Sequence, residues 1–145
     1  MPAPERIKHF IQNTLGCSCP EEVFRSIDVR RNVRLNSFIV LDSALIIGNR
    51  LLVYLAEAGS AGCIEEHLPV LVAAGKKERD EKGLNRFRLV LVADEPETVL
   101  RAAGKLFEEL RGAVGKVHLH VIHRSEMQFI TADTGENSEK KTVRT

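Results

Sequence analysis

The apolar stretch FIVLDSALIIGNRLLVYLAE (38–57) constrains the fold of this chain more than any other segment. Two runs rich in leucine, isoleucine and valine flank the pair Gly48-Asn49, which suits a tight two-residue hairpin turn. With that turn, Leu45 would lie opposite Leu52 on one face of the hairpin. Because both faces of the hairpin are largely apolar, we expect it to lie inside a sheet that is covered on both sides.

Other segments add helices and strands around this hairpin. Their hydrophobic patterns predict helices at 5–15, about 63–82 and 96–111, a short helix that begins in the segment CSCPEE, and strands at 27–35, 87–93 and 116–123. Strands that alternate with helices favour parallel pairing through right-handed crossovers. We therefore predict an α/β fold: a single domain with a mixed sheet of about five strands, built on the central hairpin and flanked by helices.

Two helix starts carry local signals. Pro69 interrupts the segment 63–82, because proline is tolerated in a first turn but disrupts a helix interior. That segment is therefore either a turn followed by a helix from about residue 67 or one kinked helix. Further along, Asp94 and Glu97 have the spacing of an N-cap residue and its N3 partner, which predicts a capping box.

Several charged or polar side chains lie on the predicted strands. Arg30, Arg31 and Arg34 are expected to form a solvated edge that resists aggregation, and contacts to phosphate are the alternative. His118 and His120 are two residues apart and therefore share one face of their strand. Paired histidines at this spacing occur in metal sites and in acid–base catalysis, and a polar stripe at the sheet edge is the simpler interpretation.

Length and charge exclude several classes of protein. A chain of 145 residues can bury the core of one domain without disulfides or a metal, and we assign that domain to 1–131 and a disordered polar tail to 132–145. A net charge of +1 gives no overall field that would attract nucleic acid or an anionic membrane. The sequence contains no recognisable signal peptide or membrane span. We expect a cytoplasmic protein without membrane or nucleic-acid partners, and homo-oligomerisation remains open.

The cysteines form the one constellation that points to chemistry. Three cysteines without a secretory signal argue against a disulfide framework. Cys17 and Cys19 form a C-x-C pair just before a predicted helix start, where backbone N–H groups and the helix dipole favour the thiolate form. Glu21 and Glu22 oppose this effect with local negative charge. The pair is a candidate for redox chemistry or for metal binding.

A second segment completes a possible metal site. Cys63 and His67 are four residues apart and project from one face of a continuous helix. Together with Cys17 and Cys19 they make a Cys₃His set, which suits tetrahedral zinc, and thiolates also hold iron–sulfur clusters. We therefore predict that Cys17 and Cys19 lie close to Cys63. The alternative is a cofactor-free protein whose cysteines pack as small hydrophobic residues, and the sequence supports it equally.

The predicted order of elements resembles one known fold. A helix, three strands with a hairpin, a helix and a further strand are similar to the core of the restriction-endonuclease-like nucleases. The segment DSALIIGNRLLVYLAE (42–57) looks like their catalytic hairpin, with Asp42 and Glu57 near the positions of the metal-binding acids. The family pattern has a lysine two residues after the second acid, and Gly59 stands there in this chain. The resemblance therefore implies a related fold without nuclease activity.

The leading interpretation of the sequence is a small protein with a cysteine-centred site that binds a metal or performs thiol redox chemistry. The alternative is a non-enzymatic interaction or assembly module with structural cysteines, or a catalytically inactive restriction-endonuclease-like fold. No catalytic residue can be named, and the sequence contains no glycine-rich nucleotide-binding loop. Whether the protein is an enzyme stays open at this point.

Overall fold

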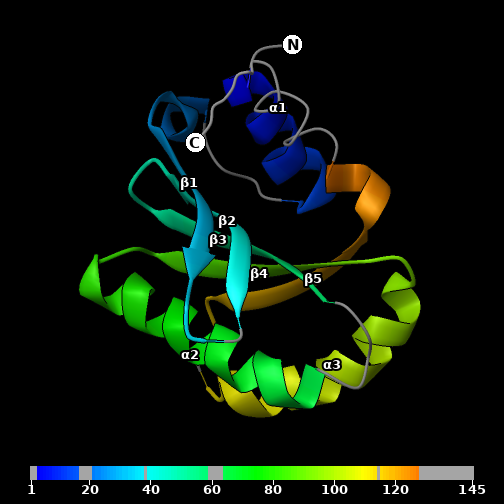
Figure 1. The fold of residues 1–145 in the computed structure, drawn as a ribbon. Coiled ribbons are helices and arrows are strands. Elements are labelled where there is room, and N and C mark those ends of the chain that lie inside the picture. Colours follow the sequence, from blue (N-terminus) through cyan, green and yellow to red (C-terminus); the bar gives the residue numbers. More distant parts are fainter. Residues whose placement is uncertain (1–2, 17–20, 38, 59–63, 114, 128–145) are drawn as a thin grey trace.

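Five strands form one mixed sheet, with helices on both of its faces (Figure 1). The computed structural model describes residues 3–16, 21–37, 39–58, 64–113 and 115–127. The predicted α/β fold is therefore confirmed, and the tail at 132–145 lies outside the described residues. None of the helices in the described part of the chain is long and apolar enough to cross a membrane.

The sheet follows the order of the strands in the sequence, β1-β2-β3-β4-β5. The strands are β1 (Ile27–Arg34), β2 (Val40–Ile47), β3 (Leu51–Glu57), β4 (Arg86–Ala93) and β5 (Val117–His123). The first three strands pair antiparallel, and β3, β4 and β5 pair parallel. Because β3, β4 and β5 run in the same direction, their carboxyl ends lie at the same end of the sheet.

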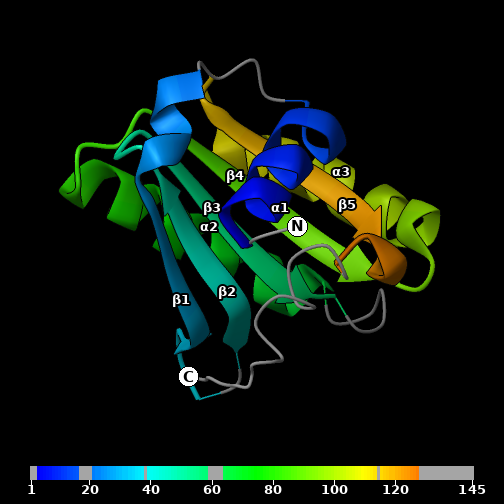
Figure 2. The same ribbon diagram turned by 90° about the horizontal axis from the view of Figure 1, so that it is seen from above.

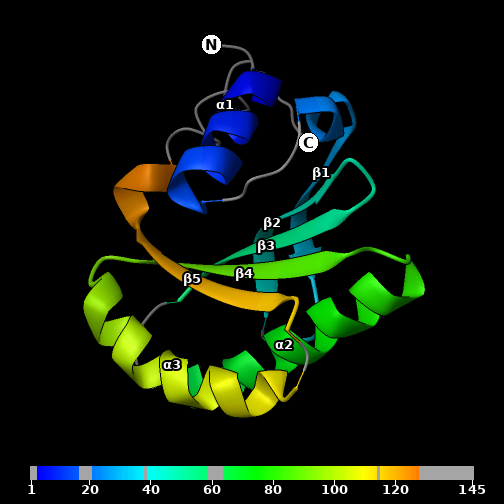
Figure 3. The same ribbon diagram turned by 180° about the vertical axis from the view of Figure 1, so that it is seen from behind.

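The helices divide between the two faces of the sheet. They are α1 (Ala3–His9) with its π-helical continuation η1 (Phe10–Thr14), the 3₁₀ helix η2 (Glu21–Arg25), α2 (Ile64–Glu81), α3 (Pro96–Arg111) and the 3₁₀ helix η4 (Arg124–Met127). Figures 1 and 3 show α2 and α3 together on one face and α1 on the other. Seen from above in Figure 2, α1 lies across the sheet.

The central hairpin is confirmed, but its turn is one residue longer than predicted. Gly48 and the residue after it adopt positive φ angles of 61° and 55°, and Arg50 is also part of the turn. The carbonyl of Arg50 accepts hydrogen bonds from backbone N–H groups just before and at the start of β4. Leu45 therefore pairs with Val53 rather than with Leu52. A shift of one residue moves Leu52 to the opposite face of the sheet.

Both faces of the sheet are buried, as the apolar hairpin predicted. The face toward α2 and α3 buries side chains from every strand except β1 and from both helices, including Leu52, Tyr54, Leu68, Phe87, Leu89 and Phe107. The face toward α1 buries the predicted apolar stripe of the N-terminal helix against the sheet, including Ile7, Phe10, Ile11, Leu15, Leu45, Val53 and Val90. Burial of these side chains is the main contribution to the stability of the fold.

The local predictions for the helix starts have different outcomes. Pro69 lies inside α2, which is one helix from its first turn to its end. The predicted capping box of Asp94 and Glu97 is wrong, because Glu95 is the N-cap residue of α3 and makes no side-chain capping bond. A proline at the first helical position pre-organises this start instead. Asp94 binds Arg124 rather than the helix.

The arginines of β1 do not form a fully solvated edge. β1 is an edge strand, as predicted. Arg30 donates a hydrogen bond of 2.6 Å to Glu78 on α2, and the side chain of Arg31 is 19% exposed and faces Asp42 at 4.0 Å. The prediction of a solvated edge is therefore wrong for these two arginines, because acids from neighbouring elements reach them. Arg34 alone of the three is exposed.

Candidate functional site

Only one of the four predicted metal ligands belongs to the described residues. His67 lies on α2, whereas Cys17, Cys19 and Cys63 lie outside the described residues. Within the part of the chain that the structure describes, no group of three or more His, Cys, Asp or Glu side chains is arranged to hold a metal ion. The Cys₃His site therefore stays a prediction.

The residues that flank the two halves of this ligand set belong to opposite faces of the sheet. Leu15, two residues before Cys17, and Val23, just after the C-x-C segment, are buried between α1 and the sheet. Ile64, which follows Cys63, begins α2 and is buried on the other face. Val23 also lies against the turn that precedes β3, whereas α2 starts beyond the carboxyl end of β3.

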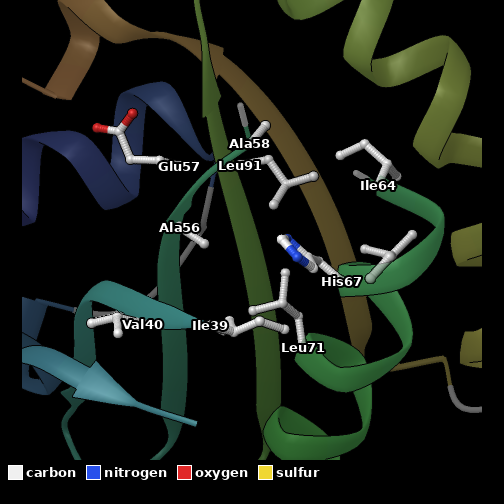
Figure 4. A pocket seen from close by; sticks show the side chains of 10 residues that line it. Ile39, Val40, Ala56, Glu57, Ala58, Ile64, His67, Leu71 and Leu91 are labelled. Carbon is white, nitrogen blue, oxygen red and sulfur yellow. The ribbon is translucent and has the colours of Figure 1, made fainter. Parts of the chain in front are cut away.

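His67 lines a small cavity of about 100 Å³ between the carboxyl end of β3 and the first turns of α2. In Figure 4 its imidazole faces into this cavity, while the carboxylate of Glu57 points away from it. The other walls are apolar, namely Ile39, Val40, Ala56, Ala58, Ile64, Leu68, Leu71 and Leu91. Among the described residues, His67 is therefore the one potential metal ligand that faces this cavity. A small, mostly apolar molecule would fit the cavity better than a metal ion would.

Charged side chains meet at the carboxyl ends of the parallel strands, where open α/β sheets commonly bind ligands. Arg124, just after β5, forms ion pairs with Glu57 at the end of β3 and with Asp94 just after β4, the latter at 2.9 Å. The hydrogen bond and charge of Arg124 lower the pKa of Asp94. These pairs are exposed, so their contribution to stability is small. Their main effect is to link the ends of three strands.

The two acids suggested by the nuclease resemblance have protein partners. Glu57 is paired with Arg124, as above. Asp42, on β2, accepts a hydrogen bond of 2.8 Å from the hydroxyl of Ser43 and lies 4.0 Å from Arg31. Gly59, at the position of the family's lysine, lies outside the described residues.

A polar network lies between β1, β3 and α2. Glu78 on α2 accepts a hydrogen bond of 2.5 Å from the hydroxyl of Tyr54 and bonds of 2.6 Å from Arg30 and Lys82. Burial and the adjacent carboxylate raise the pKa of Tyr54, so its hydroxyl remains protonated and donates. Burial alone would raise the pKa of Glu78, but the hydrogen bonds from Lys82 and Tyr54 and the charge of Arg30 hold it below its usual value.

Four basic side chains form a stripe on β4 and β5, on the face toward α1. This arginine–histidine stripe consists of Arg86, Arg88, His118 and His120. Nη1 of Arg86 lies 3.0 Å from Nε2 of His118, and Nη1 of Arg88 lies 2.8 Å from Nε2 of His120. Arg88 also donates to the carbonyl of Leu15 at 3.3 Å, at the end of the N-terminal helix. The prediction that His118 and His120 share a face is confirmed.

The histidines of the stripe are held in the neutral form. Burial, the charge of Arg88 and the adjacent His118 lower the pKa of His120 to about 4. Burial and neighbouring arginines lower the pKa of His118 as well. Each neutral imidazole can therefore accept a hydrogen bond from its arginine. Burial and the neighbouring Arg86 lower the pKa of Arg88, which reflects repulsion between two like charges.

Acid is expected to destabilise the fold through His120. Its pKa is about 4 in the folded chain and about 6.5 when unfolded, so the unfolded chain binds more protons between these values. Stability should therefore fall as the pH drops from about 6.5 toward about 4. Urea unfolding at pH 7 and pH 5 should show a smaller loss for His120→Gln than for the unmodified protein. Equal losses would contradict the assignment.

The sequence analysis did not identify the two arginines of β4 or Arg124 as members of a cluster. Arg86 and Arg88 alternate with apolar residues in RFRLVLV, and this spacing matches that of His118 and His120. Parallel pairing of the two strands would have predicted one basic stripe. Arg124, by contrast, has no local signal, because its partners come from the ends of β3 and β4.

Comparison of the chain with protein-family models, with curated proteins and with solved structures found no match.

Proposed function

We propose that the protein acts through its cysteines, with Cys17 and Cys19 as reactive thiols. The observation that carries this proposal is the hydrogen bond of 3.3 Å from Arg88 to the carbonyl of Leu15. It joins the arginine–histidine stripe to the residues that lead into the C-x-C segment. The segment C-S-C-P (17–20) directly follows Leu15 and Gly16 in the sequence.

Chain geometry limits how far the first thiol can lie from the stripe. Consecutive Cα atoms are 3.8 Å apart, so the Cα of Cys17 lies within about 7.6 Å of that of Leu15. Cationic side chains near a cysteine favour the thiolate and lower the thiol pKa, which makes the sulfur a better nucleophile. The guanidinium group of Arg88, bonded to the carbonyl of Leu15, therefore supports thiol chemistry, and its positive charge would oppose the negative charge of Glu21 and Glu22.

Thiol labelling across a range of pH tests this proposal. We expect Cys17 or Cys19 to react with iodoacetamide with an apparent pKa below the usual value of about 8.5, as identified by mass spectrometry of the labelled peptides. Arg88→Gln should raise that apparent pKa. The matched control is Arg101→Gln, which removes an exposed arginine from α3 on the other face of the sheet. An ordinary thiol pKa that Arg88→Gln leaves unchanged would contradict the proposal.

A metal site remains the alternative form of the same function. In that case Cys17, Cys19, Cys63 and His67 would bind zinc or an iron–sulfur cluster together. The flanking residues on opposite faces of the sheet favour separate roles for the two halves of this set. Elemental analysis of anaerobically purified protein distinguishes the two forms. Stoichiometric zinc or iron that is lost in Cys63→Ser would establish the shared site in place of free thiols.

An interaction or assembly module is the second candidate function. The order of α1, the three strands β1 to β3, α2 and β4 agrees with the resemblance to the restriction-endonuclease-like fold. Glu57 and Asp42 both have protein partners, which favours the inactive form of that fold. The labelling and metal experiments also decide this case, because unreactive thiols in a metal-free protein would support the module.

A further inference from the structure

We propose that the arginine–histidine stripe is a binding site for a phosphate dianion, either free or as the terminal group of a small phosphomonoester. This inference does not depend on the cysteines, because it rests on the side chains of β4 and β5 alone. It adds a ligand to the proposed function. The phosphate site and the reactive thiols are tested by separate measurements, so that either proposal can be contradicted while the other holds.

The stripe presents several hydrogen-bond donors in one place. An arginine carries five N–H donors in a planar fork, and Arg86 has one contact to His118 through Nη1. Arg88 uses Nη1 for His120 and for the carbonyl of Leu15, and its buried Nε has no hydrogen-bond partner among the described residues. Buried donors are rarely left without a partner, so a ligand oxygen near the Arg88 guanidinium would satisfy an unmet requirement.

The charges of the stripe are not balanced within the described residues. Neither Arg86 nor Arg88 forms an ion pair with an acid in the part of the chain that the structure describes. Glu108 and Arg111 on α3 lie close to the histidines, but Glu108 is already paired with Arg111 at 2.5 Å. A bound anion would relieve the repulsion between the two guanidinium groups of β4.

The spacing of the stripe favours phosphate. Arg86 and Arg88 are two residues apart on one strand, so their Cα atoms are about 7 Å apart and their side chains project from the same face. Two guanidinium groups at this spacing can donate to different oxygens of a tetrahedral dianion, whereas a carboxylate offers only two oxygens in one plane. A nearby dianion would also stabilise the positive charge of protonated His118 and His120 and so raise the pKa of both.

The stripe lies beside the edge of the sheet, because β5 is an edge strand. His118 and His120 line a cleft of about 260 Å³ between β5 and α3. Its remaining lining comes mainly from α3, including Leu100, Gly104, Phe107, Glu108 and Arg111. With its phosphate at the stripe, a small phosphomonoester would extend its remaining part past the edge strand β5 toward this cleft.

Proton NMR of the histidine rings tests the proposal on the whole protein. Titration with inorganic phosphate, and separately with glycerol 3-phosphate, should give saturable shifts of the His118 and His120 resonances and raise the pKa of both. Chloride at equal ionic strength should give neither effect. Tighter binding of glycerol 3-phosphate would identify a phosphomonoester as the ligand, and tighter binding of inorganic phosphate would identify the free anion.

Two variants separate binding from folding. Arg86→Gln and Arg88→Gln should each weaken phosphate binding by about tenfold or more, because each removes a charge-assisted donor. Arg34→Gln, at an exposed arginine of β1, should leave binding unchanged. If Arg88→Gln unfolds, Arg86→Gln decides the result. Histidine shifts that are equal in chloride and phosphate, or that persist unchanged in a folded arginine variant, would overturn the proposal.

Discussion

Gly75→Ala is expected to lower the free energy of unfolding by about 1–3 kcal/mol, although alanine is the better helix former. Gly75 lies inside α2, and a Cβ atom there would stand 2.0 Å from Cζ of Phe87. The Phe87 ring is fully buried, so it can move only by displacing other side chains of the same core. The steric cost should therefore exceed the gain in helix propensity. Urea unfolding monitored by circular dichroism measures the difference.

Gly104→Ala is the matched control. Gly104 also lies inside a helix, α3, but a Cβ atom there would have no neighbour within 4 Å. The same substitution should therefore raise the free energy of unfolding by about 0.5–1 kcal/mol, through helix propensity alone. If the two variants had equal stability, the contact between α2 and β4 would be looser than described.

Glu78→Ala is expected to lower the free energy of unfolding by about 2–3 kcal/mol, because it removes one group that serves three partners. The hydroxyl of Tyr54 would lose its strong acceptor, and Arg30 would lose its ion-pair partner. The side chain of Glu78 is 14% exposed and that of Arg30 is 36% exposed, so water compensates only in part. The effect should appear as a lower urea midpoint at pH 7.

Tyr54→Phe supplies the control for this network. It removes the hydroxyl but keeps the ring, which contacts Phe87 edge-on with centroids 5.0 Å apart. Its cost should be smaller, and the double variant with Glu78→Ala should cost less than the sum, because the two groups bind each other. Since the pKa of Glu78 is held low, its stabilisation should be present above about pH 4.5 and be lost as the pH falls below that value. Additive effects would show that the hydroxyl and the carboxylate are not coupled.

The fold was largely predictable because it follows from local patterns of apolar residues and turn residues in the sequence. The helix at 96–111 has apolar residues at helical spacing, and the hairpin at 38–57 consists of two short apolar runs on either side of Gly48-Asn49. The length of the turn was not predictable from its glycine. The third turn residue is Arg50, whose carbonyl accepts hydrogen bonds from backbone N–H groups just before and at the start of β4. Those hydrogen bonds exist only in the folded sheet.

The candidate sites were less predictable, because they depend on contacts between distant parts of the chain. The pairing of His118 with Arg86 requires the register between β4 and β5. Likewise, the sequence places Glu78 in the polar C-terminal half of a helix. Its contacts with Arg30 and Tyr54 depend on how α2 packs on the sheet. Periodicity identifies which face of an element is buried, but it does not identify the partner on the other side.

The position of α1 has a consequence for how the chain folds during synthesis. The helix is synthesised before all five strands, yet it packs on a surface that includes Val90, Val92 and Ile122, which are made much later. Its apolar residues therefore stay exposed until most of the chain has been translated, and their burial is a late, long-range step. During that interval Phe10 and Ile11 are exposed hydrophobic side chains that chaperones can bind.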